Sequence, residues 1–399
     1  MSSRRLKAAG PISALATAPD ASCLLAFSQA NSSVALWTGT LEGDGTVLPW
    51  EGLVTTGAVE PSTTRMLLYQ PPNLLLAELE DDALCIRWEQ PVDGVLGVLW
   101  DTSASAFAIH LDDGSWRRAC IINSQVNLEP RLPPSMGCAQ AEVDSAGHLY
   151  TLTPRYQLLI DGKEVSRKVS SMHVYEPFLL LTTIDHRLYA IPIDQIKPGI
   201  TESELLREGW CRTAERGARL VAGVSGLTAV VLQMPRGNLE TVHPRPIALY
   251  QAARLATRRE YKAAVVFMRR HRLNLNLLPD RDPAAFAAEM GEFVAALADA
   301  SLLNLFIAEL ADGNVIHRLY KDAFPLQLSA QTNGGKKVRP ERLFSAALAT
   351  YDFQLVMAVA ERSDADPKEF LPFLNRLKAL QPPAYRRFHI ESHLQRWDK

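Results

Sequence analysis

Long apolar runs, paired cysteines and excess charge are all missing from this sequence. No stretch of 18 apolar residues occurs in the 399 residues, so we expect no membrane-spanning helix and no membrane partner. The five cysteines are an odd number without a C-x-x-C pair, which predicts neither a disulfide framework nor a zinc site. A reducing compartment fits this pattern, and we expect a cytoplasmic protein, with the nucleus as the alternative.

The patterns of common catalytic sites are also missing. Neither G-x-G-x-x-G nor G-x-x-x-x-G-K-[ST] occurs to cradle a phosphate, and no G-x-S-x-G presents a nucleophilic serine. His389 and His393 are four residues apart with Glu391 between them, but no third ligand is evident, so we interpret them as surface residues. The sequence therefore predicts a protein that is not an enzyme and holds no cofactor or metal.

The net charge of −2 excludes a strongly basic nucleic-acid binder but conceals an uneven distribution. Residues 1–244 carry 19 basic and 27 acidic side chains, whereas residues 245–399 carry 23 and 17. The two parts are therefore expected to differ in fold and in partners.

Short strands in pairs dominate residues 20–244, each pair being two apolar runs separated by a tight polar turn. Six such hairpins are predicted, and they join 22–27 to 34–37, 74–79 to 84–88, 106–111 to 116–122, 148–152 to 156–160, 178–183 to 187–191, and 228–234 to 239–243.

The hairpins recur about every 41 residues, which is typical of the four-stranded blades of a β-propeller. A β-sandwich is the alternative, but its strands would follow one another without this longer period. Trp100-Asp101 and Gly147-His148 resemble pieces of the WD-type signature, although their order and positions are unusual. We expect residues 1–244 to form a WD40-like propeller that is degenerate or incomplete.

Helical periodicity replaces the strand pattern from residue 246 onward. Asp282-Pro283, Asp299 or Ser301, and Asp366-Pro367 supply predicted helix starts. Helices of about 10 to 25 residues with short connections favour an α-solenoid of TPR-like helix pairs over residues 245–399. Residues 330–337 are the one clear flexible break.

A basic stripe is predicted along the first of these helices, which begins near Ile247. Its members are Arg254, Arg258, Lys262 and Arg269, and Arg259, Arg270, His271 and Arg272 lie beside them. Such a stripe could contact phosphates, but a solvated helix face is the simpler interpretation because no aromatic residues interleave it.

The most distinctive segment is the turn of the last hairpin, formed by Met234, Pro235, Arg236, Gly237, Asn238, Leu239 and Glu240. Pro235 suits the second position of a tight turn, and Gly237 and Asn238 tolerate a positive φ. This segment, together with 268–278, 351–361 and 366–375, resembles the largest, scaffold subunit of the Elongator complex, the IKAP family. The resemblance covers about residues 140–399 and is specific over the last 170 of them.

That resemblance implies a non-catalytic scaffold for the modification of wobble uridines in tRNA to carboxymethyl-type products. The implied partners are the catalytic radical-SAM and acetyltransferase subunit and the second propeller subunit, with tRNA bound indirectly or weakly. No counterpart of the family's first propeller, or of its C-terminal dimerisation and basic tRNA-contacting region, is recognisable, so we expect a shortened version or a piece of that subunit. A propeller-solenoid subunit of a vesicle-coat or transport complex remains the alternative.

Overall fold

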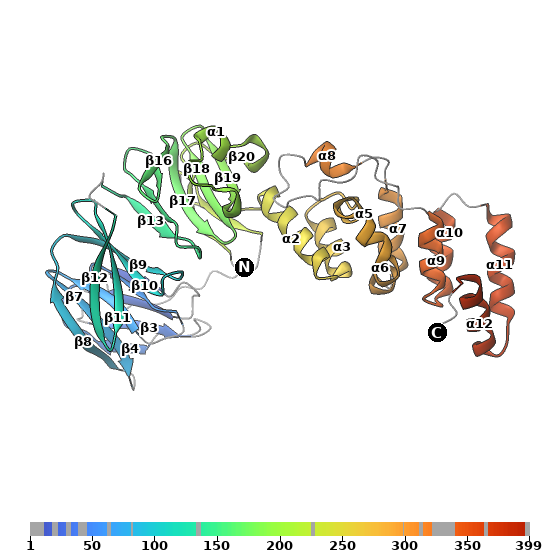
Figure 1. Ribbon diagram of the computed structural model, residues 1–399, viewed down its shortest axis with the longest axis horizontal. Helices are drawn as coiled ribbons and strands as arrows, with labels where there is room; N and C mark the ends of the chain where they lie inside the picture. Colours follow the sequence, from blue (N-terminus) through green and yellow to red (C-terminus); the bar gives the residue numbers. More distant parts are fainter. Residues whose placement is uncertain are drawn as a thin grey trace. The chain divides into compact units, whose positions relative to one another are not determined.

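The computed structural model describes residues 12–17, 23–28, 33–38, 46–61, 65–80, 83–132, 137–224, 228–297, 299–310, 314–320, 340–362 and 366–395. Internal contacts divide the chain into two compact units. The first comprises Met1–Leu205, Thr213–Ala222 and Val231–Glu240, and the second comprises Leu206–Arg212, Gly223–Val230 and Thr241–Lys399. Figure 1 shows the β-sheets of the first part of the chain in blue and green and the helices that follow in yellow to red.

The described strands form six separate sheets, each built from consecutive strands. The first sheet contains β1 (Ile12–Thr17), β2 (Cys23–Ser28), β3 (Ser33–Thr38) and β4 (Thr46–Pro49). The second contains β5 (Thr56–Val59), β6 (Arg65–Gln70), β7 (Asn73–Glu80) and β8 (Ala83–Pro91). The third contains β9 (Val95–Asp101), β10 (Ala106–Leu111), β11 (Trp116–Ile122) and β12 (Gln125–Leu132).

The remaining sheets follow the same order. The fourth contains β13 (Gln140–Val143), β14 (Leu149–Leu152), β15 (Leu158–Ile160) and β16 (Lys163–Ser166). The fifth contains β17 (Val169–Tyr175), β18 (Phe178–Thr183), β19 (Arg187–Pro192) and β20 (Cys211–Thr213). The sixth has three strands, β21 (Arg219–Gly223), β22 (Val230–Gln233) and β23 (Leu239–Val242). The short helices η1 (Ile193–Gln195), α1 (Glu202–Leu205) and η2 (Glu208–Trp210) lie between β19 and β20.

All six predicted hairpins are present, one in each sheet. The second strands of the sheets are the most apolar: β10 and β18 are buried along their whole length. Such strands need cover on both faces, and neighbouring blades of a propeller provide it. The first strands of consecutive sheets contact one another from β1 through β5, β9 and β13 to β17, which is the packing of blades side by side. The first part of the chain therefore has the propeller type of fold.

From Arg245 onward, the regular elements of the described residues are helices. They are α2 (Arg245–Thr257), α3 (Tyr261–Arg270), α4 (Leu277–Arg281), α5 (Pro283–Ala288), α6 (Met290–Leu297), α7 (Ala300–Glu309), α8 (Val315–Leu319), α9 (Pro340–Leu348), α10 (Phe353–Arg362), α11 (Pro367–Ala379) and α12 (Pro383–His393). A single apolar core runs through them from Ala248 to Ile390, with Phe286, Phe293 and Phe306 in mutual ring contact. A continuous core between successive helices is the packing of an α-solenoid.

Three helix starts follow the sequence prediction. Asp282 accepts a hydrogen bond from the Ala285 N–H at the start of α5, and Asp366 accepts one from the Lys368 N–H at the start of α11. At α7 the cap is Asp299 rather than Ser301, because the Asp299 carboxylate accepts the Ser301 and Leu302 N–H groups. Each aspartate satisfies amide groups that the first helical turn leaves unpaired. The predicted break at 330–337 lies outside the described residues.

Two helix predictions were wrong. The longest described helices have 13 residues, so the expected upper length of about 25 was too great. The single helix expected from Ile247 is also broken into α2 and α3. Arg259 has a φ of +59°, its N–H donates to Ala256 O, and the Glu260 N–H donates to Leu255 O. This is a Schellman end with arginine where glycine is usual, so no local pattern in the sequence predicted it.

Candidate interaction surfaces

The described residues contain no group of three or more histidine, cysteine or acidic side chains that could hold a metal ion. His389 and His393, weighed as ligands from their spacing, instead contact aromatic rings. His389 lies 4.5 Å from the Tyr385 ring, and His393 lies 4.7 Å from the Phe373 ring. Glu391 is buried and accepts a hydrogen bond from the Tyr351 hydroxyl. His393 is exposed and His389 is half-buried, in agreement with their interpretation as surface residues, whereas Glu391 is buried.

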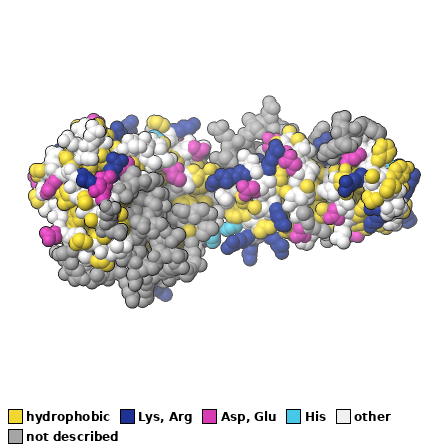
Figure 2. Space-filling view, turned by 90° about the horizontal axis from the view of Figure 1, so that it is seen from below, with side chains coloured by type: hydrophobic (Ala, Val, Ile, Leu, Met, Phe, Trp, Pro, Cys, Tyr) yellow, Lys and Arg dark blue, Asp and Glu magenta, His cyan; other side chains and the backbone are white. Residues whose placement is uncertain are grey.

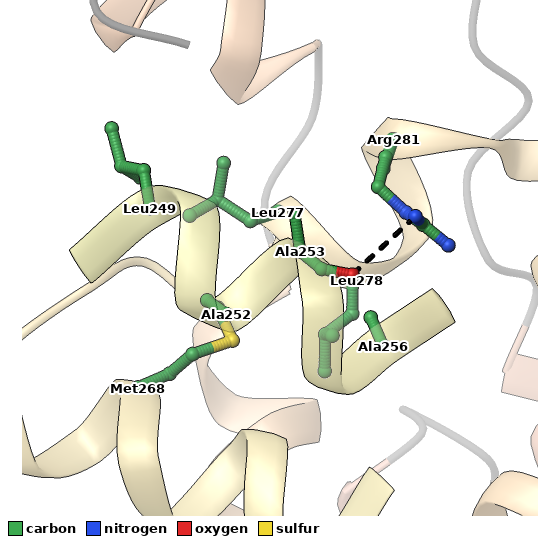
Figure 3. Close-up of a pocket in the computed structure, with 8 residues that line it drawn as sticks. All are labelled: Leu249, Ala252, Ala253, Ala256, Met268, Leu277, Leu278 and Arg281. Carbon is green, nitrogen blue, oxygen red and sulfur yellow. Dashed lines mark hydrogen bonds between the residues drawn. The ribbon is translucent and has the colours of Figure 1, made fainter. Parts of the chain in front are cut away.

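A small cavity lies among the first helices (Figure 3). Its volume is about 10 Å³, and its lining is mainly alanine, leucine and Met268, with Arg281 at one side. A space of this size holds one water molecule at most. Arg281 is already engaged, because its Nη1 donates to Thr257 Oγ1 at 2.5 Å and to Ala253 O at 3.5 Å. We interpret the cavity as a packing gap, not a ligand site.

A larger recess of about 560 Å³ lies open along β11 and β12. Asp113, Arg117 and Arg131 contribute charge to its lining, and Trp116 and Leu132 contribute apolar surface. Arg131 is held in an ion pair with Asp101. Ser115 also lines the recess, and its N–H donates to Asp113 Oδ1 at 2.8 Å.

The distinctive hairpin turn projects from the sixth sheet. The Gly237 N–H donates to Met234 O, and the Met234 N–H donates to Asn238 O, both at 2.8 Å. Gly237 has a φ of +84°, whereas Asn238 is not in the positive-φ region that the sequence allowed it. Met234 anchors the turn because it is buried, and the six residues 235–240 are exposed. Leu239 is 63% exposed, so the turn presents an apolar side chain to solvent.

The predicted basic stripe is distributed over two helices. Arg254 lies on α2, Arg258 caps its C-terminus, and Lys262 and Arg269 lie two turns apart on α3. All four side chains are exposed, and none has an ion-pair partner among the described residues. Arg259 differs from its neighbours, since it pairs with Glu289 at 2.8 Å and Glu292 at 3.1 Å.

A pair of histidines joins the two ends of this helical hairpin, a feature that sequence reasoning missed. His243, just before α2, and His271, just after α3, have ring centroids 5.2 Å apart. Thr228 Oγ1 lies 3.1 Å from His243 Nδ1, and the Phe267 ring lies 4.3 Å from that of His271. Burial lowers the pKa of His271, and His243 and Arg270 lower it further by repulsion. The spacing of 28 residues gave no sequence signal for this contact.

Comparison with protein families gives two matches to one family. The model described as "ELP1 N-terminal second beta-propeller" matches residues 80–221. The model described as "ELP1 alpha-solenoid" matches residues 245–340 and 337–377. The matches follow one another in the same order as the sheets and helices of the structure.

Curated relatives agree with these matches. "Putative elongator complex protein 1" of Xenopus laevis is 30% identical over 339 residues, which cover 67% of this chain and 29% of the relative. "Elongator complex protein 1" of Oryctolagus cuniculus is 28% identical in an alignment 406 positions long, which covers 80% of this chain and 30% of the relative. The chain thus spans about 30% of the length of these relatives.

Among solved structures, the β-propeller domain of Cps50 (Swd1) from Myceliophteria thermophila aligns with a TM-score of 0.43 and 10% identity, covering 60% of this chain and 86% of that one. Among the described helices, none has both the length and the apolar character needed to cross a bilayer.

Proposed function

Because the chain belongs to the family of Elongator complex protein 1, we propose that it is a non-catalytic scaffold subunit that supports carboxymethyl-type modification of wobble uridines in tRNA. One observation carries the proposal: two models of this one family match consecutive parts of the chain, first sheets and then helices. In this proposal residues 1–244 act as the propeller and residues 245–399 as the solenoid.

The architecture suits a scaffold for a physical reason. Propeller blades and stacked helices are repeats that expose long surfaces without requiring a central active site. The described residues hold no cluster that could bind a metal ion, and the cavity among the first helices holds one water molecule at most. The exposed surfaces of the sheets and helices therefore support the proposal best. The partners we propose are the catalytic radical-SAM and acetyltransferase subunit and the second propeller subunit, with tRNA held mainly through them.

The hairpin turn at 234–240 is our proposed contact for one of these subunits. Its fold requires little beyond Pro235, the positive φ of Gly237 and the buried Met234 anchor. Arg236, Asn238, Leu239 and Glu240 are exposed, so they are free to meet a partner. An exposed leucine flanked by polar and charged groups suits a protein interface, in which an apolar centre is surrounded by a polar rim.

The test is an affinity purification of the tagged full chain from cell extract, followed by mass spectrometry of the bound proteins. We expect the Elongator catalytic and second propeller subunits to be recovered. Leu239→Asp should reduce their recovery, whereas Leu96→Asp, at another exposed leucine, should not. Recovery of coat or transport components instead would refute the proposal and favour the alternative propeller-solenoid function.

A second measurement addresses the modification itself. The chain is expressed in cells from which the endogenous scaffold gene has been deleted, and modified wobble nucleosides in total tRNA are quantified by mass spectrometry. We expect partial or full restoration of the carboxymethyl-type nucleosides. If the Elongator subunits assembled normally but the carboxymethyl-type nucleosides were not restored, the part of the proposal that concerns tRNA modification would be refuted.

A further inference from the structure

The open end of the α2–α3 hairpin carries a concentration of cationic side chains. The contact between His243 and His271 brings the residues before α2 next to those after α3. Arg245 begins α2, Arg269 and Arg270 end α3, and Arg272 follows one residue later. We call Arg245, Arg269, Arg270, Arg272, His243 and His271 the arginine corner. Figure 2 shows dark-blue side chains gathered beside cyan histidines at this part of the helical region.

The positive charge of this corner is largely uncompensated. Glu260 is the only acidic residue between positions 241 and 279, and it caps the opposite end of α3. Arg269, Arg270 and Arg272 are exposed and have no ion-pair partner among the described residues. The Glu309 carboxylate reaches the following loop, where it accepts the Leu275 N–H at 3.4 Å. The guanidinium groups of Arg269, Arg270 and Arg272 thus remain available to an anion from outside, whereas that of Arg245 lies 5.9 Å from the centre of the Tyr320 ring.

The backbone fixes these groups in place. Arg272 has a φ of +52°, its N–H donates to Arg269 O, and the Leu273 N–H donates to Met268 O, so α3 ends in a second Schellman turn. Met268 and Leu273 are buried and hold this turn against the solenoid core. Arginines on an ordered turn lose less entropy on binding than arginines on a loose chain.

The chemistry of the corner suits a phosphate backbone. Arginine forms bidentate hydrogen bonds with phosphate, and several arginines close together suit a ligand with one negative charge per repeating unit. The corner exposes neither an aromatic platform for unstacked bases nor a large apolar anchor of the kind that protein partners use, since Phe267 is half-buried against His271. This combination favours a double helix, recognised through its phosphates, over a single strand or an acidic protein.

We propose that the arginine corner binds the phosphate backbone of double-helical RNA. The choice of RNA over DNA rests on the proposed function, because the family membership leads us to expect tRNA nearby. The corner itself rests on the charges and contacts described above.

The test measures binding of the full chain to a labelled 20-base-pair RNA duplex by fluorescence anisotropy at several salt concentrations. The test variant is Arg269→Gln/Arg270→Gln/Arg272→Gln. The control, Arg117→Gln/Arg155→Gln/Arg216→Gln, removes the same charge from exposed arginines of the first unit. Arg269→Lys/Arg270→Lys/Arg272→Lys retains the charge, and circular dichroism verifies that every variant is folded.

Each phosphate contact adds about 0.9 to the slope of log K against log salt for duplex DNA, and we use the same figure for RNA. The test variant should therefore lower the slope by about 2 to 3 and the affinity by at least about tenfold in 0.1 M salt. The control variant should lose less than about twofold, and the lysine variant should keep the slope. Equal losses in the test and control variants, or no binding by the parent in 0.05 M salt, would overturn the proposal.

Two further arms test the identity of the ligand. A matched DNA duplex should bind at least several-fold more weakly, and polyglutamate should compete poorly. Equal binding of DNA, or efficient competition by polyglutamate, would refute the assignment to RNA. Affinity purification with the arginine-corner variant separates the two proposals: Elongator subunits should still be recovered when RNA binding is lost.

Discussion

Arg131 Nη1 lies 2.9 Å from Asp101 Oδ2, and both side chains are more than nine-tenths buried. The pair connects the last strand of the third sheet, β12, to the end of its first strand, β9. Arg131 also donates through Nη2 to Gly147 O, at 2.8 Å, in the turn between β13 and β14 of the fourth sheet. A single guanidinium thereby joins two sheets of the propeller region.

Removing one member of the Arg131–Asp101 pair should lower the free energy of unfolding. Arg131→Met leaves the Asp101 carboxylate buried without its counter-charge, and we expect a loss of about 3–5 kcal/mol in the free energy of unfolding. Arg131→Met combined with Asp101→Asn should lose less, because no isolated charge remains. Urea denaturation followed by tryptophan fluorescence measures both, with the exposed Arg155→Met as control. A loss below about 1 kcal/mol in the single variant would contradict this account.

Side-chain contacts between the fourth and fifth sheets should protect the backbone of β17 from hydrogen exchange. Glu142 Oε2 accepts the Val174 N–H at 2.6 Å, and Gln140 Nε2 donates to Met172 O at 2.6 Å, so side chains of β13 satisfy the edge of β17. In Gln140→Ala/Glu142→Ala, we expect amide hydrogen exchange to accelerate in the peptide covering β17, because these backbone groups lose their partners. The exposed Glu51→Ala serves as control. Unchanged exchange in β17 would show that these contacts do not stabilise the edge.

Because the His110 ring is buried, we expect the folded protein to lose stability in mild acid. Its ring stacks on Trp116 with centroids 4.7 Å apart, and burial lowers its pKa, with Asp113 opposing that shift. Between its lowered pKa and the unfolded value of about 6.5, the unfolded chain binds a proton that the folded chain does not. Stability should therefore fall as pH decreases through this window, by at most about 1.4 kcal/mol per pH unit, and stay unaffected by this group above it.

The variant His110→Phe should weaken that pH dependence, since phenylalanine can stack on Trp116 without titrating. The exposed His186→Asn is the control, and asparagine tolerates the positive φ of 60° at that position. Thermal unfolding of the full chain between pH 5 and pH 8 provides the comparison. If the stability of His110→Phe and of the parent varied identically with pH, His110 would not be the cause of the loss in acid.

Replacing either of two glycines by alanine causes no steric clash, but the two substitutions should change the stability of the protein in opposite directions. Gly237 has a φ of +84°, so Gly237→Ala should destabilise by about 1 kcal/mol through backbone strain. Gly291 lies in α6 without a positive φ, so Gly291→Ala should stabilise by about 0.5–1 kcal/mol through helix propensity. Chemical denaturation measures both changes. Stabilisation by Gly237→Ala would contradict the turn geometry.

The sequence by itself determined the elements that depend on neighbouring residues. Alternating apolar runs and polar turns located all six hairpins, because strand and turn preferences act over a few residues. Asp282 and Asp366 identified helix starts for the same reason, since a cap bonds to amides two or three residues away. The turn at Pro235 and Gly237 was also visible in the sequence, because both residues favour backbone angles that few others adopt.

Only the tertiary structure decided how these elements meet. The break between α2 and α3 uses Arg259 in a conformation that arginine rarely adopts, so no local signal predicted it. Trp100-Asp101 and Gly147-His148 were separate fragments in the sequence, yet Arg131 connects Asp101 to Gly147 across two sheets. The arginine corner likewise requires the contact between His243 and His271. Such arrangements depend on packing between residues tens of positions apart, which local preferences do not encode.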